Sequence, residues 1–150
     1  MVAGRIPGSY VLDLFAGSGA FGLEAVSRGA EKVFLVESSP VCISTIKQNV
    51  ESLDTAFYCE VLRQDAADFV ENYPTDSRRF DLIFADPPYG KGLAKNILLL
   101  INHYDILMHS GLLVIEHHRA DSMPEAEGSI TILKQKTYGD TTISVYTKND

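Results

Sequence analysis

The chain has 150 residues, of which 45% are hydrophobic and 22% are charged, and its formal net charge is −7. This length and composition predict one globular domain over residues 1–150 and exclude disordered, collagen-like and disulfide-rich classes. The acidic balance weighs against a nucleic-acid partner that is held by charge alone, because phosphate binding draws on clustered Lys and Arg.

Membrane and metal features are not expected from the sequence. Its apolar runs are far shorter than the roughly 20 residues that span a bilayer, and no signal-peptide pattern begins the chain. The two cysteines, Cys42 and Cys59, show no zinc-ligand spacing with histidine. We therefore expect a cytoplasmic monomer with reduced thiols, no bound metal and no membrane partner.

Strands and helices alternate along most of the chain. Apolar and amphipathic patterns predict helices over residues 20–28, 40–53, 65–73 and 93–104. The same patterns predict strands over residues 10–15, 33–36, 57–62, 80–85, 111–116, 129–136 and 141–148. The last two strands flank a hairpin turn at residues 138–140. This order predicts an α/β fold: a mostly parallel, seven-stranded, Rossmann-like sheet with a C-terminal antiparallel hairpin and helices on both faces. Ligands of such sheets bind beyond the carboxyl ends of the strands.

A glycine loop follows the first predicted strand. Residues 17–22 match the pattern G-x-G-x-x-G, in which Gly17 and Gly19 let the backbone approach a ligand. Glu37 ends the second strand, where a carboxylate takes the hydroxyls of a ribose. The pattern suits a dinucleotide, so a nicotinamide-dependent oxidoreductase is one interpretation. A tight turn with glycines that only serve helix packing is another.

Asp13, inside the first strand, favours a different ligand. A carboxylate at this position would repel a pyrophosphate and attract an ammonium group. S-adenosylmethionine carries an ammonium, a sulfonium and a ribose, and it has no phosphate. Asp65 follows the third strand, where it could accept a hydrogen bond from an adenine amine, cap the next helix, or do both.

Asp86-Pro87-Pro88-Tyr89 follows the fourth predicted strand. Two prolines stiffen the segment and leave its carbonyl groups free of helical hydrogen bonds. The Asp86 carboxylate and the Pro87 carbonyl could accept both N–H groups of one planar amine, while Tyr89 stacks on the ring that carries it. Such positioning is what methylation of an exocyclic base amine requires. A proline-rich turn without a function is the alternative.

Together these residues resemble a known family. Residues 11–30, Glu37, Asn49, Asp65 and residues 86–89 are similar to the bacterial 16S rRNA guanine-N2 methyltransferases of the ribosomal small-subunit methyltransferase D type. The likeness implies a class I methyltransferase fold and methyl transfer from S-adenosylmethionine to a guanine N2 amine in 16S rRNA or the small ribosomal subunit. It also implies two sets of site residues. The cofactor-binding residues would be Asp13, Gly17, Gly19, Glu37, Asp65 and Ala66. The residues that hold the target base would be Asp86, Pro87 and Tyr89.

The sequence departs from this family at its amino terminus. Only residues 1–9 precede the first strand, where members carry a longer stretch rich in Arg and Lys. Without that stretch, we expect less basic surface for RNA, in keeping with the net charge of −7. Two alternatives therefore stay open beside guanine methylation: an N6-adenine methyltransferase of DNA or RNA, and a non-catalytic module that binds S-adenosylmethionine.

His117 and His118 are adjacent in a predicted strand. Neighbouring side chains of a strand point to opposite faces of the sheet, so the two imidazoles would not converge on a metal or a substrate. We expect a structural or surface role for both.

Overall fold

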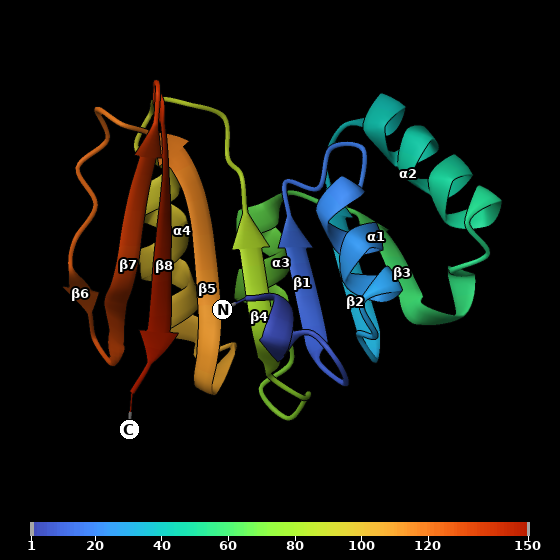
Figure 1. The fold of residues 1–150 in the computed structure, drawn as a ribbon, viewed down its shortest axis with the longest axis horizontal. Helices are drawn as coiled ribbons and strands as arrows, with labels where there is room; N and C mark the ends of the chain where they lie inside the picture. The colour runs from blue at the N-terminus through green and yellow to red at the C-terminus, as the bar shows by residue number, and fades with distance from the viewer. Residues whose placement is uncertain (1, 150) are drawn as a thin grey trace.

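A computed structural model describes residues 2–149, and its central feature is one mixed sheet of eight strands (Figure 1). The strands are β1 (Tyr10–Leu14), β2 (Lys32–Glu37), β3 (Cys59–Arg63), β4 (Phe80–Ala85), β5 (Leu107–His118), β6 (Ala126–Glu127), β7 (Ile130–Tyr138) and β8 (Thr141–Lys148). The helices are α1 (Ala20–Ser27), α2 (Pro40–Ser52), α3 (Ala66–Asn72) and α4 (Leu93–Tyr104), with short 3-10 turns η1 (Ala3–Arg5) and η2 (Ala56–Tyr58).

The strand order is β3-β2-β1-β4-β5-β8-β7-β6. The first five strands in this order pair in parallel, and β5, β8, β7 and β6 pair antiparallel. The predicted architecture is confirmed, including the C-terminal hairpin. The count of seven strands is one short, because the two-residue strand β6 pairs with β7 and is too brief to leave an alternating pattern in the sequence.

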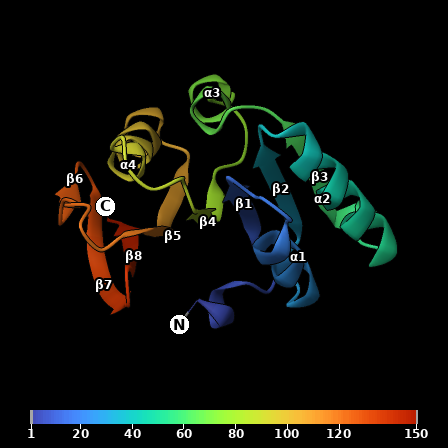
Figure 2. The same cartoon turned by 90° about the horizontal axis from the view of Figure 1, so that it is seen from above.

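Helices cover both faces of the sheet, as expected. Helices α1 and α2 bury apolar side chains against one face, and α3 and α4 bury theirs against the other. Figure 2 shows the sheet from above, with α3 and α4 on one side and α1 on the other. This arrangement leaves the carboxyl ends of the parallel strands open at one edge.

The starts of β3 and β5 depart from the expected strand boundaries by two and four residues. Phe57 was expected in the third strand but lies in η2, where it is 85% exposed. The strand begins at Cys59, which pairs with Val33, because the residues just before it form the 3-10 turn η2. Strand β5 begins four residues early, at Leu107, since Leu107 pairs with Phe80 across a register shift.

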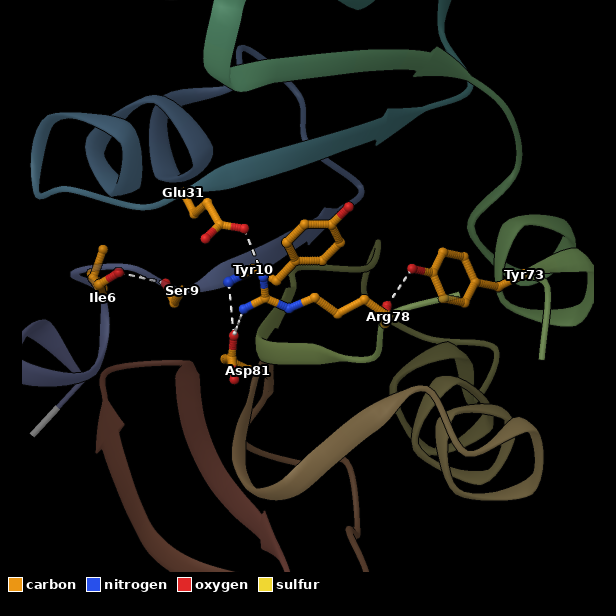
Figure 3. A network of polar contacts seen from close by, with 7 residues as sticks. All are labelled: Ile6, Ser9, Tyr10, Glu31, Tyr73, Arg78 and Asp81. Atoms are coloured by element: carbon orange, nitrogen blue, oxygen red, sulfur yellow. Dashed lines mark hydrogen bonds and ion pairs between the residues drawn. The ribbon is translucent and has the colours of Figure 1, made fainter. Parts of the chain in front are cut away.

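The amino-terminal edge of the sheet is closed by a polar network around Arg78 (Figure 3). The Arg78 guanidinium forms ion pairs with Glu31 at 2.6 Å and with Asp81 at 3.2 Å. It also lies over the Tyr10 ring, 4.5 Å from the ring centre. Asp81 accepts a second hydrogen bond, from the Tyr10 N–H at 2.8 Å. The network therefore ties the start of β1 to β2 and β4.

The described part of the chain shows two further negative findings. None of its helices is long and apolar enough to cross a membrane. Residues 2–149 also contain no group of three or more His, Cys, Asp or Glu side chains placed to hold a metal ion.

Candidate functional site

A cavity of about 620 Å³ opens at the carboxyl edge of the parallel strands. This volume is typical of small-molecule sites. Five of the expected site residues line the cavity, and they follow three different strands: Glu37, Asp65, Asp86, Pro87 and Tyr89. The four others, Asp13, Gly17, Gly19 and Ala66, lie outside its lining.

The glycine loop is held in place by Glu37. One oxygen of the Glu37 carboxylate accepts the N–H of Gly17 at 2.9 Å, and the other accepts the N–H of Ser39 at 2.9 Å. Gly17 and Gly19 have φ angles of 59° and 83°, a left-handed conformation that suits glycine. Glu37 thus fixes the loop before α1 and the start of α2, while each carboxylate oxygen keeps a further lone pair toward the cavity.

Asp13 lies beneath the loop, with only 1% of its surface exposed. Its carboxylate accepts the N–H of Gly22 at 3.0 Å. A Cβ on Gly22 would lie 2.7 Å from a methyl carbon of Leu35, so this glycine permits α1 to pack closely on the sheet. Burial, and to a smaller degree the charges of Asp86 and Glu37, raise the pKa of Asp13 to about 8. Near neutral pH the free protein therefore holds Asp13 mainly as a neutral acid, and its contact with a cofactor ammonium stays a prediction.

Asp65 caps helix α3. Its Oδ1 accepts the N–H groups of Ala67 at 2.9 Å and of Asp68 at 3.3 Å. The side chain is exposed and lines the cavity, and no donor within residues 2–149 reaches its Oδ2. The structure thus shows the capping role and leaves the second oxygen available to a ligand. Ala67, rather than the expected Ala66, contributes to the lining.

Asp86 opens onto the cavity directly after β4. Pro87 is buried behind it, and Pro88 and Tyr89 are exposed. Within residues 2–149, no N–H or O–H group donates to the Asp86 carboxylate and no cation pairs with it. Partial burial, followed by the charge of Glu116, raises the pKa of Asp86 to about 6. The carboxylate is therefore largely ionised near neutral pH and has its acceptor positions free.

Tyr89 is held by the C-terminal strands. Its hydroxyl shares a hydrogen bond of 2.6 Å with the Thr141 hydroxyl. Its ring packs edge-on against the His118 ring, with 5.4 Å between the ring centres. Tyr89 is 49% exposed, so about half of the residue is open to solvent. His118 and Thr141 were missed as supports of this residue, because they are far from it in the chain.

The expectation for His117 is confirmed. Its side chain is buried, Nε2 shares a hydrogen bond of 2.8 Å with the Ser144 hydroxyl, and Nδ1 lies 3.0 Å from the His118 carbonyl oxygen. Both ring nitrogens are thus occupied within the fold. Phe21 of α1 stacks on Phe84 of β4 with ring centres 4.2 Å apart.

Known proteins resemble the chain over nearly its whole length. The family model described as "Conserved hypothetical protein 95" matches residues 1–147. A Bacillus subtilis (strain 168) protein, provisionally named as an rRNA methyltransferase, is 36% identical over 99% of this chain and 80% of that protein. Ribosomal RNA small subunit methyltransferase D of Haemophilus influenzae is 33% identical over 92% of this chain and 71% of that protein. The crystal structure of a provisionally named Haemophilus influenzae methylase aligns with a TM-score of 0.90 at 31% identity, covering 99% of this chain and 92% of that chain.

Proposed function

The chain belongs to the conserved hypothetical protein 95 family, and from this membership and the site we propose that it is an S-adenosylmethionine-dependent methyltransferase. We propose further that its target is the N2 amine of a guanine in 16S rRNA of the small ribosomal subunit. The observation that carries the proposal is the free carboxylate of Asp86, held by two prolines beside Tyr89 at the rim of the cavity. The names of these relatives support an rRNA substrate.

The residues around the glycine loop fit S-adenosylmethionine. The remaining lone pairs of Glu37 suit the two ribose hydroxyls, and Gly17 and Gly19 place no side chain at their own positions in the loop. The unengaged Oδ2 of Asp65 suits the adenine amine, with the Ala66 backbone beside it. Asp13, once ionised, suits the ammonium group. A phosphate would instead meet the carboxylates of Glu37 and Asp86 in the cavity, which favours methyl transfer over the nicotinamide alternative.

When bound, the cofactor supplies an electrophilic methyl group on a sulfonium. Asp86 and the Pro87 carbonyl accept the two N–H groups of the guanine amine and turn its lone pair out of conjugation with the ring. Tyr89 stacks on the base and fixes its plane. With its protons held in this way, the amine nitrogen would direct its lone pair at the methyl group that the cofactor would supply, and one proton would leave the nitrogen. The Asp86 carboxylate is placed to receive that proton and pass it to water.

The test is transfer of isotope-labelled methyl from S-adenosylmethionine to 16S rRNA and, in parallel, to small ribosomal subunits that lack the modification. The RNA is then digested and its nucleosides separated. We expect label in N2-methylguanosine. Label in N6-methyladenosine would contradict the guanine target and favour an N6-adenine methyltransferase. No label on either substrate, with S-adenosylhomocysteine still bound, would leave the binding-module alternative.

A further inference from the structure

Asp86 has a second carboxylate beside it, that of Glu116. The parallel register pairs Ala85 of β4 with Ile115 of β5, so the next residues, Asp86 and Glu116, stand side by side at the carboxyl edge. Both side chains line the same cavity. Glu116 is half-buried, and its charge contributes to the raised pKa of Asp86. The pair was not visible in the sequence, because thirty positions separate the two residues.

The hydrogen bonds of the five carboxylates at this edge divide them into two groups. Asp13, Glu37 and Asp65 accept backbone N–H groups and hold the loops in place. Asp86 and Glu116 accept no hydrogen bond from residues 2–149 and pair with no cation there. Two like charges side by side with no partner disfavour the fold. A stabilising role therefore does not explain the pair, whereas a ligand with several adjacent donors does.

Guanine presents such donors. Its N1–H and its N2 amine are adjacent on one edge of the base, whereas adenine has an acceptor nitrogen beside its amine. We propose that Glu116 is a specificity-determining residue whose carboxylate accepts the N1–H of the target guanine while Asp86 and the Pro87 carbonyl hold the N2 amine. This inference rests on the proposed function and deepens it. A base with a lone pair at N1 would face the Glu116 carboxylate without a proton between them, and a site built around a donor rejects an analogue that lacks it.

Guanosine and 2-aminopurine riboside test this directly. Both carry the 2-amine, but only guanosine has the N1–H. Each is titrated by NMR into the full chain saturated with S-adenosylhomocysteine, for the wild type, Glu116→Gln and the control Glu51→Gln, which removes one exposed charge on α2. The wild type and the control should bind guanosine about tenfold more tightly than 2-aminopurine riboside. Glu116→Gln should lose this preference, because its amide can donate to the bare N1 as well as accept from N1–H.

Each outcome separates this inference from the proposed function. A guanosine preference that persists in Glu116→Gln overturns the role of Glu116, as does a wild type that binds the two nucleosides equally or binds neither. If the wild type still forms N2-methylguanosine in rRNA, the proposed function survives that failure. If it forms none, the proposed function fails whatever the nucleosides do. Thermal unfolding of the three proteins confirms that the substitutions leave the fold intact.

Discussion

The two edges of the parallel sheet differ in whether their charged side chains have partners. At the amino-terminal edge, Arg78 is paired with Glu31 and Asp81 and lies over Tyr10, so each charge has a partner (Figure 3). At the carboxyl edge, Asp86 and Glu116 stand side by side with no cation and no donor among the described residues. The same strands connect both edges.

This difference separates stability from function. Paired charges at the amino-terminal edge connect β1, β2 and β4. Burial and the charge of Glu116 raise the pKa of Asp86. Adjacent unpaired carboxylates cost stability, and such groups gather where a ligand binds them. The carboxyl edge is therefore the place where we propose that a donor-rich base and a cationic cofactor bind.

The largest expected effect comes from Asp86→Ala. The variant removes the acceptor that orients the amine and receives its proton, so kcat/KM for methyl transfer should fall by about a hundredfold or more. Affinity for S-adenosylhomocysteine, measured by calorimetry, should stay unchanged. Asp81→Ala is the matched control at the other edge and should keep its methyl transfer. Equal losses in the two variants would contradict the division between the edges.

Asp13→Asn should change how stability depends on pH. The pKa of Asp13 is about 8 in the fold and near 3.8 when the chain is unfolded, so the folded state favours the neutral acid. The contribution of Asp13 to the free energy of unfolding is thus fully present below pH 3.8. It is lost as pH rises through about 8, by up to about 1.4 kcal/mol per pH unit. The asparagine keeps an acceptor for Gly22 and does not titrate. Urea unfolding at pH values across this range should show the free energy of unfolding of the variant rising relative to that of the wild type as pH rises. A difference between the two proteins that does not change with pH would refute the effect of burial on Asp13.

Arg78→Ala tests the paired edge. It removes two partly exposed ion pairs and one cation–π contact, so the free energy of unfolding should fall by about 1 kcal/mol. Denaturant unfolding gives the loss, and the exposed residue Lys47 supplies the control, Lys47→Ala. Methyl transfer by the folded variant should be unaffected. A drop in kcat with unchanged stability would place Arg78 in the active site, against this account.

The smallest effect is expected from Tyr89→Phe. The ring remains available for stacking, and only the hydrogen bond to the Thr141 hydroxyl is lost. The loss of one exposed hydrogen bond of this kind should lower kcat/KM by about threefold. Tyr89→Ala also removes the stacking surface and should cost more. If both substitutions reduced kcat/KM equally, the hydroxyl rather than the ring would be the important part.

Local patterns predicted what local chemistry controls. The glycine loop and the proline segment after β4 both depend on neighbours in the chain. Features that the pattern did not reveal depend on long-range packing. Asp13 is covered because α1 packs on it at Gly22, and Glu116 reaches the site only through the register of β4 with β5.

The most direct measurement is the pH dependence of kcat/KM for methyl transfer, in the wild type and in Glu116→Gln. Asp86 must be ionised to accept the amine, and its raised pKa places the loss of activity near pH 6 as the solution is acidified. Without the charge of Glu116 the pKa of Asp86 falls, so the acid limb of the variant should move to lower pH. A wild-type profile that is flat through this region, or an acid limb that Glu116→Gln leaves in place, would contradict the claim that the free carboxylates of the carboxyl edge hold the substrate.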